Sequence, residues 1–245
     1  MGTLELEAGN RRFARKFFKL SLEDPTDNSV AQAEWADERD KLSLVSADAL
    51  KLPGTFEARS KFHFREGKFR EAVRDAWTWL RDEPFSREPA VWGSYVASSA
   101  TEDHGEAAAM LNVALIANPT DVVLLNNLAF CYATTGDLTK AKDYLARAKA
   151  NVPDDRQGSV LAATSGLIKF REGDFEKGRE LYNVAVDFFR SRGAKRLAAM
   201  AALMLAREEK LARLPVFYTT LEMARELSKG LEEPEVRLWL ERLER

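Results

Sequence analysis

Apolar residues recur every three or four positions along most of the chain, the spacing that places them on one face of an α-helix. In the clearest stretch, 122–155, these positions are Leu125, Leu128, Ala129, Tyr132, Ala141, Leu145 and Ala148. The eight prolines, at positions 25, 53, 84, 89, 119, 153, 215 and 234, fall between such runs or in their first turn. Because proline breaks helix interiors, the prolines mark helix ends. The pattern therefore predicts an all-α chain of consecutive helices.

A nine-residue segment occurs twice in similar form, as FREGKFREA (64–72) and as FREGDFEKG (170–178). A looser copy, YATTGDLTKA (132–141), lies between them. The glycines of the three copies are separated by 69 and 37 residues, about two periods and one period of roughly 34 to 35 residues. Such a period indicates an array of helix-turn-helix repeats.

The stretch 122–155 resembles the tetratricopeptide repeat (TPR) family. Its small residue, its alanines and its closing proline fall at the family's spacing, with Leu125 in place of the usual first aromatic residue. The resemblance covers about residues 53–192, although the repeat at 88–121 lacks the turn glycine and has Tyr95 where a small residue is usual. It implies a right-handed α-solenoid of about six antiparallel helix pairs.

Three segments are predicted on this basis. Residues 1–52 would form N-terminal helices, either a degenerate repeat or a cap. Residues 53–231 would form the TPR-like array of helix pairs. Residues 232–245 would form a C-terminal capping helix, whose stripe of apolar residues comprises Val236, Trp239, Leu240 and Leu243. The same stripe suggests an alternative, a homodimer formed through this helix.

Side-chain size along the repeats supports this packing independently of the family. Ala129 and Gly166 on first helices, and Ala141 on a second helix, are small enough to let two backbones approach closely. Asp137 and Asp174 directly follow a turn glycine, where a short acceptor side chain caps the free amides of the next helix.

The resemblance also implies a concave groove lined by first helices, where such arrays commonly bind peptides or partner helices. Asn127 lies where the family usually keeps an asparagine for the ligand backbone, and Arg65 and Arg171 could hold carboxylates. Glu57 and Trp92 replace the lysine and asparagine of the chaperone-tail clamp, so a chaperone role is not expected. The candidate partner-binding residues are Lys61, Arg65, Trp92, Asn126, Asn127, Phe130 and Arg171.

Two basic clusters stand out in a chain whose net charge is only −2. The first consists of Arg11, Arg12, Arg15, Lys16 and Lys19, interleaved with Phe13, Phe17 and Leu20. We interpret it as a terminal helix that docks its phenylalanines on the array, with contact to an anionic surface or nucleic acid as the alternative. The second consists of Arg190, Arg192, Lys195 and Arg196, and is interpreted as a solvated helix end.

Catalytic and metal-binding patterns are not recognisable in the sequence. The chain has no phosphate-binding glycine loop and no G-x-S-x-G segment. His63 and His104 lie on different repeats without ligand spacing, and the single cysteine, Cys131, lies in an apolar run that predicts burial. We therefore expect no enzyme activity, no cofactor and no bound metal.

Apolar runs long enough to span a bilayer are also missing, and the first residues lack a secretory pattern. The expectation is a cytoplasmic protein with no membrane or nucleic-acid partner. We predict a scaffold or adaptor that binds a peptide or partner protein in its concave groove. Two alternatives stay open: a regulatory or sensor repeat subunit that controls a partner enzyme, and a self-assembling structural repeat protein.

Overall fold

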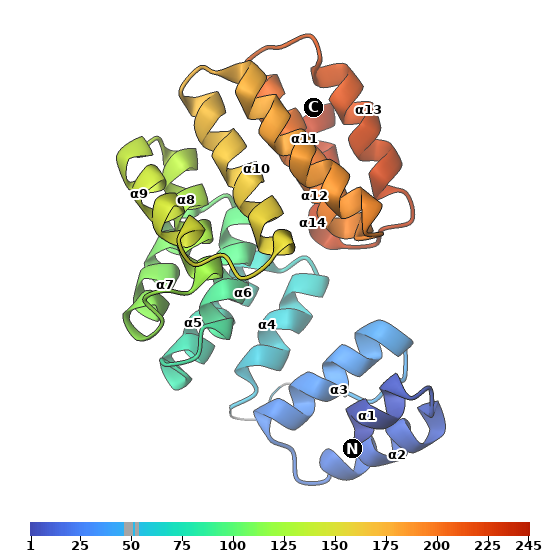
Figure 1. Ribbon diagram of the computed structural model, residues 1–245. Coiled ribbons are helices and arrows are strands. Elements are labelled where there is room, and N and C mark those ends of the chain that lie inside the picture. Colours follow the sequence, from blue (N-terminus) through green and yellow to red (C-terminus); the bar gives the residue numbers. More distant parts are fainter. Residues whose placement is uncertain (47–50, 52–53) are drawn as a thin grey trace. The chain divides into compact units, whose positions relative to one another are not determined.

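The computed structural model describes residues 1–46, 51 and 54–245, and these residues form fourteen α-helices and no strand (Figure 1). The all-α class predicted from the sequence is confirmed. The chain divides into two compact units, Met1–Glu83 (unit 1) and Pro84–Arg245 (unit 2). The predicted boundary between residues 52 and 53 involves residues outside those described, and the three-segment division stays a prediction.

Unit 1 contains five helices: α1 (Gly2–Glu7), α2 (Arg11–Ser21), α3 (Asp27–Asp40), α4 (Phe56–Arg65) and α5 (Phe69–Asp82). The apolar side of α2 buries Ala14 and Phe18 in a small core shared with α1 and α3. Helices α4 and α5 form a closely packed pair. Helix α2 thus docks on its neighbours through a narrow stripe, and the rest of its surface faces outward.

Unit 2 is built from helix pairs that follow one another along the chain (Figure 1). The pairs are α6 (Glu88–Ser99) with α7 (His104–Ala117), α8 (Val122–Thr135) with α9 (Leu138–Lys149), α10 (Asp155–Arg171) with α11 (Phe175–Ser191), and α12 (Lys195–Leu211) with α13 (Phe217–Ser228). Each pair also contacts the next, as stacked repeats require to bury their apolar faces. We call the side formed by α6, α8, α10 and α12 the first-helix face.

The turns within the pairs follow the predicted chemistry. Gly136 and Gly173 have φ angles of 92° and 84°, which side-chain-bearing residues rarely adopt. Asp137 and Asp174 accept hydrogen bonds from the backbone amides of the following helix turn. In the degenerate repeat, Glu102 stands 34 residues before Gly136 and takes the same left-handed conformation with φ 55°. The turn therefore forms in this repeat as well, with Glu102 in the place of the glycine.

Close helix packing at the small residues is confirmed. A Cβ atom added to Gly166 would lie 2.8 Å from the backbone oxygen of Gly178, so no side chain fits between α10 and α11. Ala129 and Ala141 are fully buried. These positions set how near the two helices of a pair approach.

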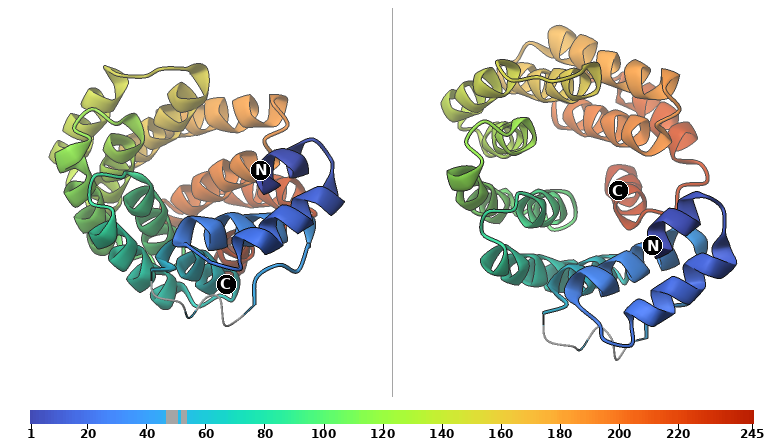
Figure 2. Two further views of the ribbon diagram at one scale, coloured as in Figure 1. Left: turned by 90° about the horizontal axis from the view of Figure 1, so that it is seen from below. Right: turned by 60° about the horizontal axis from the view of Figure 1, so that its bottom comes forward.

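The last helix, α14 (Pro234–Glu244), continues no pair. It packs on α12 and α13, and the right view of Figure 2 shows it, in red, between α12 and α6. The Arg242 guanidinium donates hydrogen bonds to the carbonyls of Ser99 and Ala100, at 3.2 and 2.7 Å, where α6 ends. A cation at the carbonyl end of a helix is favourable. Helix α14 thus lies against the first-helix face.

Candidate functional site

A pocket of about 210 Å³ opens on the first-helix face of unit 2. Three predicted partner-binding residues, Asn126, Asn127 and Phe130, line it from α8. Apolar side chains of α10, α12 and α14 also line it, among them Val160, Ala163, Met200, Met204 and Trp239. Its concave, mainly apolar wall with a few polar groups is typical of binding sites.

The polar wall of the pocket is a short hydrogen-bond relay. The Thr164 hydroxyl donates to the Asn126 side-chain oxygen at 2.8 Å, and the Asn126 amide donates to the Asn127 side-chain oxygen at 3.3 Å. Asn126 is buried, whereas Asn127 is only partly covered. The relay therefore fixes Asn126 and holds the more exposed Asn127 at the pocket wall.

A neutral histidine borders Phe130. The His104 ring meets the Phe130 ring edge-on, with 5.7 Å between centroids. Burial, reinforced by the nearby Arg207, lowers the pKa of His104 to about 4, so the ring is uncharged at neutral pH.

Cys131 also lines this pocket. Burial raises the pKa of its thiol to about 12, which leaves it unreactive. The predicted burial of Cys131 is confirmed.

Two guanidinium groups lie close to the ring of Trp239 in α14. Arg207 and Arg242 stand over its ring at 5.5 and 4.9 Å from the centroid, a favourable arrangement of cations on an aromatic face. The indole nitrogen of Trp239 is buried and has no hydrogen-bond partner among the described residues.

An ion-pair network holds α14 in place beside this pocket. Glu235, which is 1% exposed, accepts from Arg196 at 2.7 and 2.9 Å and from the Tyr95 hydroxyl at 2.7 Å. Arg196 in turn donates to the Tyr95 oxygen at 2.6 Å. Three helices, α6, α12 and α14, are thus tied together by one buried carboxylate.

Arg171 does not line the pocket. It pairs with the buried Glu208, whose carboxylate also accepts from Arg207 at 3.0 Å. Burial raises the pKa of Glu208, and the two arginines act against that rise. The carboxylate that the sequence suggested for Arg171 is in this structure supplied by the chain itself.

The other predicted residues lie elsewhere. In unit 1, Arg65 pairs with the buried Glu34, and Lys61 pairs with Glu57 one turn earlier. Trp92 of α6 is half-buried beside Tyr95, with 6.3 Å between ring centroids, and does not line the pocket. Sequence reasoning missed Tyr95, His104 and Trp239 as site residues. Tyr95 did carry a signal, since a tyrosine replaces the small residue expected there.

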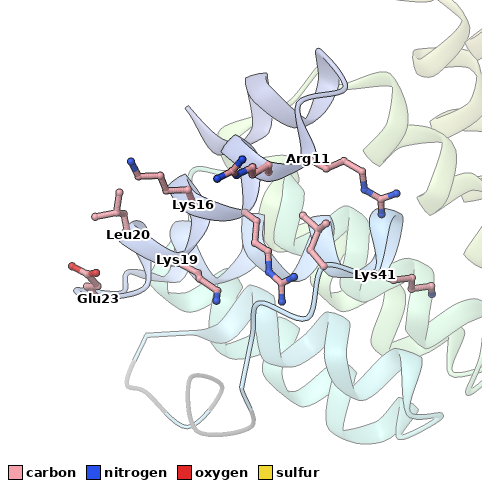
Figure 3. Close-up of a pocket in the computed structure, with 9 residues that line it drawn as sticks. Arg11, Lys16, Lys19, Leu20, Glu23 and Lys41 are labelled. Atoms are coloured by element: carbon pink, nitrogen blue, oxygen red, sulfur yellow. The ribbon is translucent and has the colours of Figure 1, made fainter.

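The basic face of α2 is a second candidate surface, drawn in Figure 3. This face borders an open hollow of about 760 Å³. Lys41 and Leu42, which follow α3, also line the hollow, as do Leu20 and Glu23. The α2 cations that line it are Arg11, Arg12, Arg15, Lys16 and Lys19. Arg11 donates to the Asp40 carbonyl and lies 3.8 Å from the Asp40 carboxylate. Phe13, predicted to dock, is 56% exposed, whereas Phe18 is buried.

Charge is placed unfavourably for helix stability along α2. The pairs Arg11 with Arg15, Arg12 with Lys16, and Arg15 with Lys19 each put like charges four residues apart, which costs about 0.2–0.5 kcal/mol per pair. Arg11 and Arg12 also open the helix, and no acidic residue balances them in the first turn. Helix formation alone does not explain this pattern.

Three of the four cations in the second basic cluster have a contact within the chain. Arg190 lies 3.1 Å from the Asp187 carboxylate, Arg192 stands over the Phe188 ring, and Arg196 pairs with Glu235. The interpretation as a solvated helix end holds for the exposed Arg190, Arg192 and Lys195 but is wrong for Arg196, which anchors α14.

Within residues 1–46, 51 and 54–245, no cluster of three or more histidine, cysteine, aspartate or glutamate side chains could hold a metal ion. None of the described helices has both the length and the apolar character needed to cross a bilayer.

Comparison with known proteins identifies the repeat. Residues 100–163, which cover α7, α8, α9 and the start of α10, match the tetratricopeptide repeat family model. A search of curated proteins found no match. Together with the stacked helix pairs and the glycine-aspartate turns, the match identifies residues 100–163 as tetratricopeptide repeats, as the sequence pattern predicted.

Proposed function

We propose that this chain is a non-enzymatic interaction protein that holds a protein partner on the first-helix face of unit 2. Tetratricopeptide repeats generally mediate protein-protein interactions. The observation that carries the proposal is the pocket in which Asn127, Phe130 and Trp239 meet. An apolar pocket with oriented polar groups is where binding energy concentrates in protein interfaces.

The pocket's size and chemistry define the proposed contact. A volume of about 210 Å³ suits one large apolar side chain of the partner. The Asn127 side chain would bind the partner backbone, and the Trp239 ring would form part of the apolar wall around the partner's side chain. Because α14 forms one wall, the partner would bind beside this helix without replacing it.

Filling the pocket tests the proposal. The variant Ala163→Phe adds a ring to the α10 wall, and Asn127→Ala removes the amide without filling the space. Val113→Phe is the control, since Val113 is exposed on α7 and does not line the pocket. We expect cross-linking and affinity purification from the native cells to recover the same partner with the wild type and Val113→Phe, but not with Ala163→Phe.

Circular dichroism would confirm that each variant folds. Recovery of the same partner by all folded variants would move the binding surface away from the pocket.

The identity of that partner would show whether the protein acts as a scaffold, an adaptor or a regulatory subunit. The homodimer through α14 stays a prediction that this packing disfavours, because Val236, Trp239 and Leu243 are buried within unit 2. A cytoplasmic location is part of the proposal and would be tested by cell fractionation.

A further inference from the structure

We propose that the basic face of α2, together with Lys41, binds an acidic segment of a protein partner. The surface is made entirely of unit 1 residues and adds a second contact to the one proposed for unit 2. Its defining property is a concentration of positive charge that the chain does not use internally. The chain as a whole carries a net charge of −2, so this charge is local.

The cations of this surface lack internal partners. Within the described residues, the side chains of Arg12, Arg15, Lys16, Lys19 and Lys41 form no ion pair and no hydrogen bond. All five are exposed, and all border the same hollow (Figure 3). Only Arg11 is engaged, with Asp40. The face is therefore free to attract anionic groups from outside.

Packing does not require these charges. Helix α2 docks through Ala14 and Phe18, which lie on the side opposite to Lys16. Uncharged polar residues at the basic positions would keep that contact and remove the repulsion between successive turns. The like charges on α2 oppose helix formation and add no packing contact. Such a pattern is expected where function requires it.

The size of the hollow suits a peptide segment. The cations border a hollow of about 760 Å³, within the usual range for ligand pockets. An extended peptide chain can lie along this open hollow and bring several carboxylates to the cations that border it. Recognition of acidic motifs by arginine clusters is a recurring mode of peptide binding.

The hollow also has apolar walls. Leu20, Leu42 and the hydrocarbon stems of the arginines and lysines lie beside the charged groups. Phe13 is exposed on the same helix. The fitting ligand is therefore a segment in which carboxylates alternate with apolar side chains, so that each charge meets a cation and each apolar group meets a stem.

The test is fluorescence anisotropy with the full chain and a short fluorescein-labelled peptide of alternating glutamate and leucine. A matched peptide with glutamine in place of glutamate is the ligand control. We expect the glutamate peptide to bind at least about tenfold more tightly, with an affinity that falls as salt is added. Equal binding of the two peptides would overturn the proposal.

Protein variants locate the contact. In Arg12→Glu/Lys16→Glu, affinity should fall by about tenfold or more, whereas Arg190→Glu/Arg192→Glu, with the same change in net charge, should lose less than about twofold. Thermal melting would show that both variants fold. Equal loss in both would indicate a general charge effect and overturn the site.

Duplex DNA and phosphatidylserine vesicles serve as competing probes. Tighter binding of either through Arg12 and Lys16 would assign the face to another polyanion and overturn the peptide proposal. If the glutamate peptide does not bind while Ala163→Phe still abolishes partner recovery, the proposed function of unit 2 stands and only this second surface fails.

Discussion

Two basic clusters of similar composition have different roles in this protein. On α2, five cations lie within nine residues, and among the described residues only Arg11 has an internal partner. At residues 190–196, three of four cations meet an internal carboxylate or ring, and Arg196 helps to hold α14. The comparison shows that a charged run acquires its role from the groups that the fold places opposite it.

The largest change in stability is expected when the ion pair between Arg196 and the buried Glu235 is broken. Glu235 is 1% exposed, and in Arg196→Ala it would keep Tyr95 as its remaining partner, so the cost should be about 3 kcal/mol of unfolding free energy. Urea denaturation would measure it. A cost below about 0.5 kcal/mol, typical of surface changes, would remove the distinction between the two clusters.

A smaller loss of stability is expected from Arg171→Ala, which also removes one partner of a buried glutamate. Glu208 is 1% exposed but keeps Arg207 as a second partner. We therefore expect a loss of about 1–2 kcal/mol, smaller than for Arg196→Ala. If urea denaturation gives the opposite order, Arg207 does not compensate for Arg171.

A pH effect of about 1 kcal/mol is expected from His104, after allowance for solvent screening. Its folded pKa of about 4 lies below the ordinary histidine value of 6.5, so the unfolded chain binds the proton first. This contribution is fully present above pH 6.5 and is lost as pH falls towards 4. The difference in stability between pH 7 and pH 5 should shrink in His104→Gln.

The pH dependence of stability expected from Asp27 in unit 1 is opposite in sign to that from His104. Burial raises its pKa to about 6 from 3.8, so the folded state binds the proton more tightly. Its contribution to stability therefore declines as pH rises from 3.8 to 6. Accordingly, Asp27→Asn should steepen the rise in stability between pH 4 and 6, and an unchanged slope in thermal melts would contradict this assignment.

The smallest effect is expected at α2. Arg12→Glu removes one repulsion between successive turns and places an acid in the first turn, so unfolding free energy should rise by about 0.5 kcal/mol. Differential scanning calorimetry would detect the higher melting temperature. Destabilisation instead would mean that Arg12 has a structural partner and that the α2 face resembles the second cluster.

Local sequence determined the helices and how they pair. Gly136, Gly173 and the aspartates that follow them specify turns, because a left-handed glycine and an acceptor for free amides act over a few residues. Gly166 indicated close packing, because a residue without a Cβ atom lets a neighbouring helix approach closely. The basic face of α2 was also readable, because residues three and four apart share a helix face.

Only the tertiary structure decided which distant groups meet. Glu235 joins Arg196 and Tyr95, which lie 39 and 140 residues away along the chain, and nothing in helical spacing relates them. In the same way, Trp239 was predicted as part of a capping stripe, and only the position of α14 places it in the pocket with Asn127. Periodicity fixes the face on which a side chain lies, whereas the stacking of repeats fixes what that face contacts.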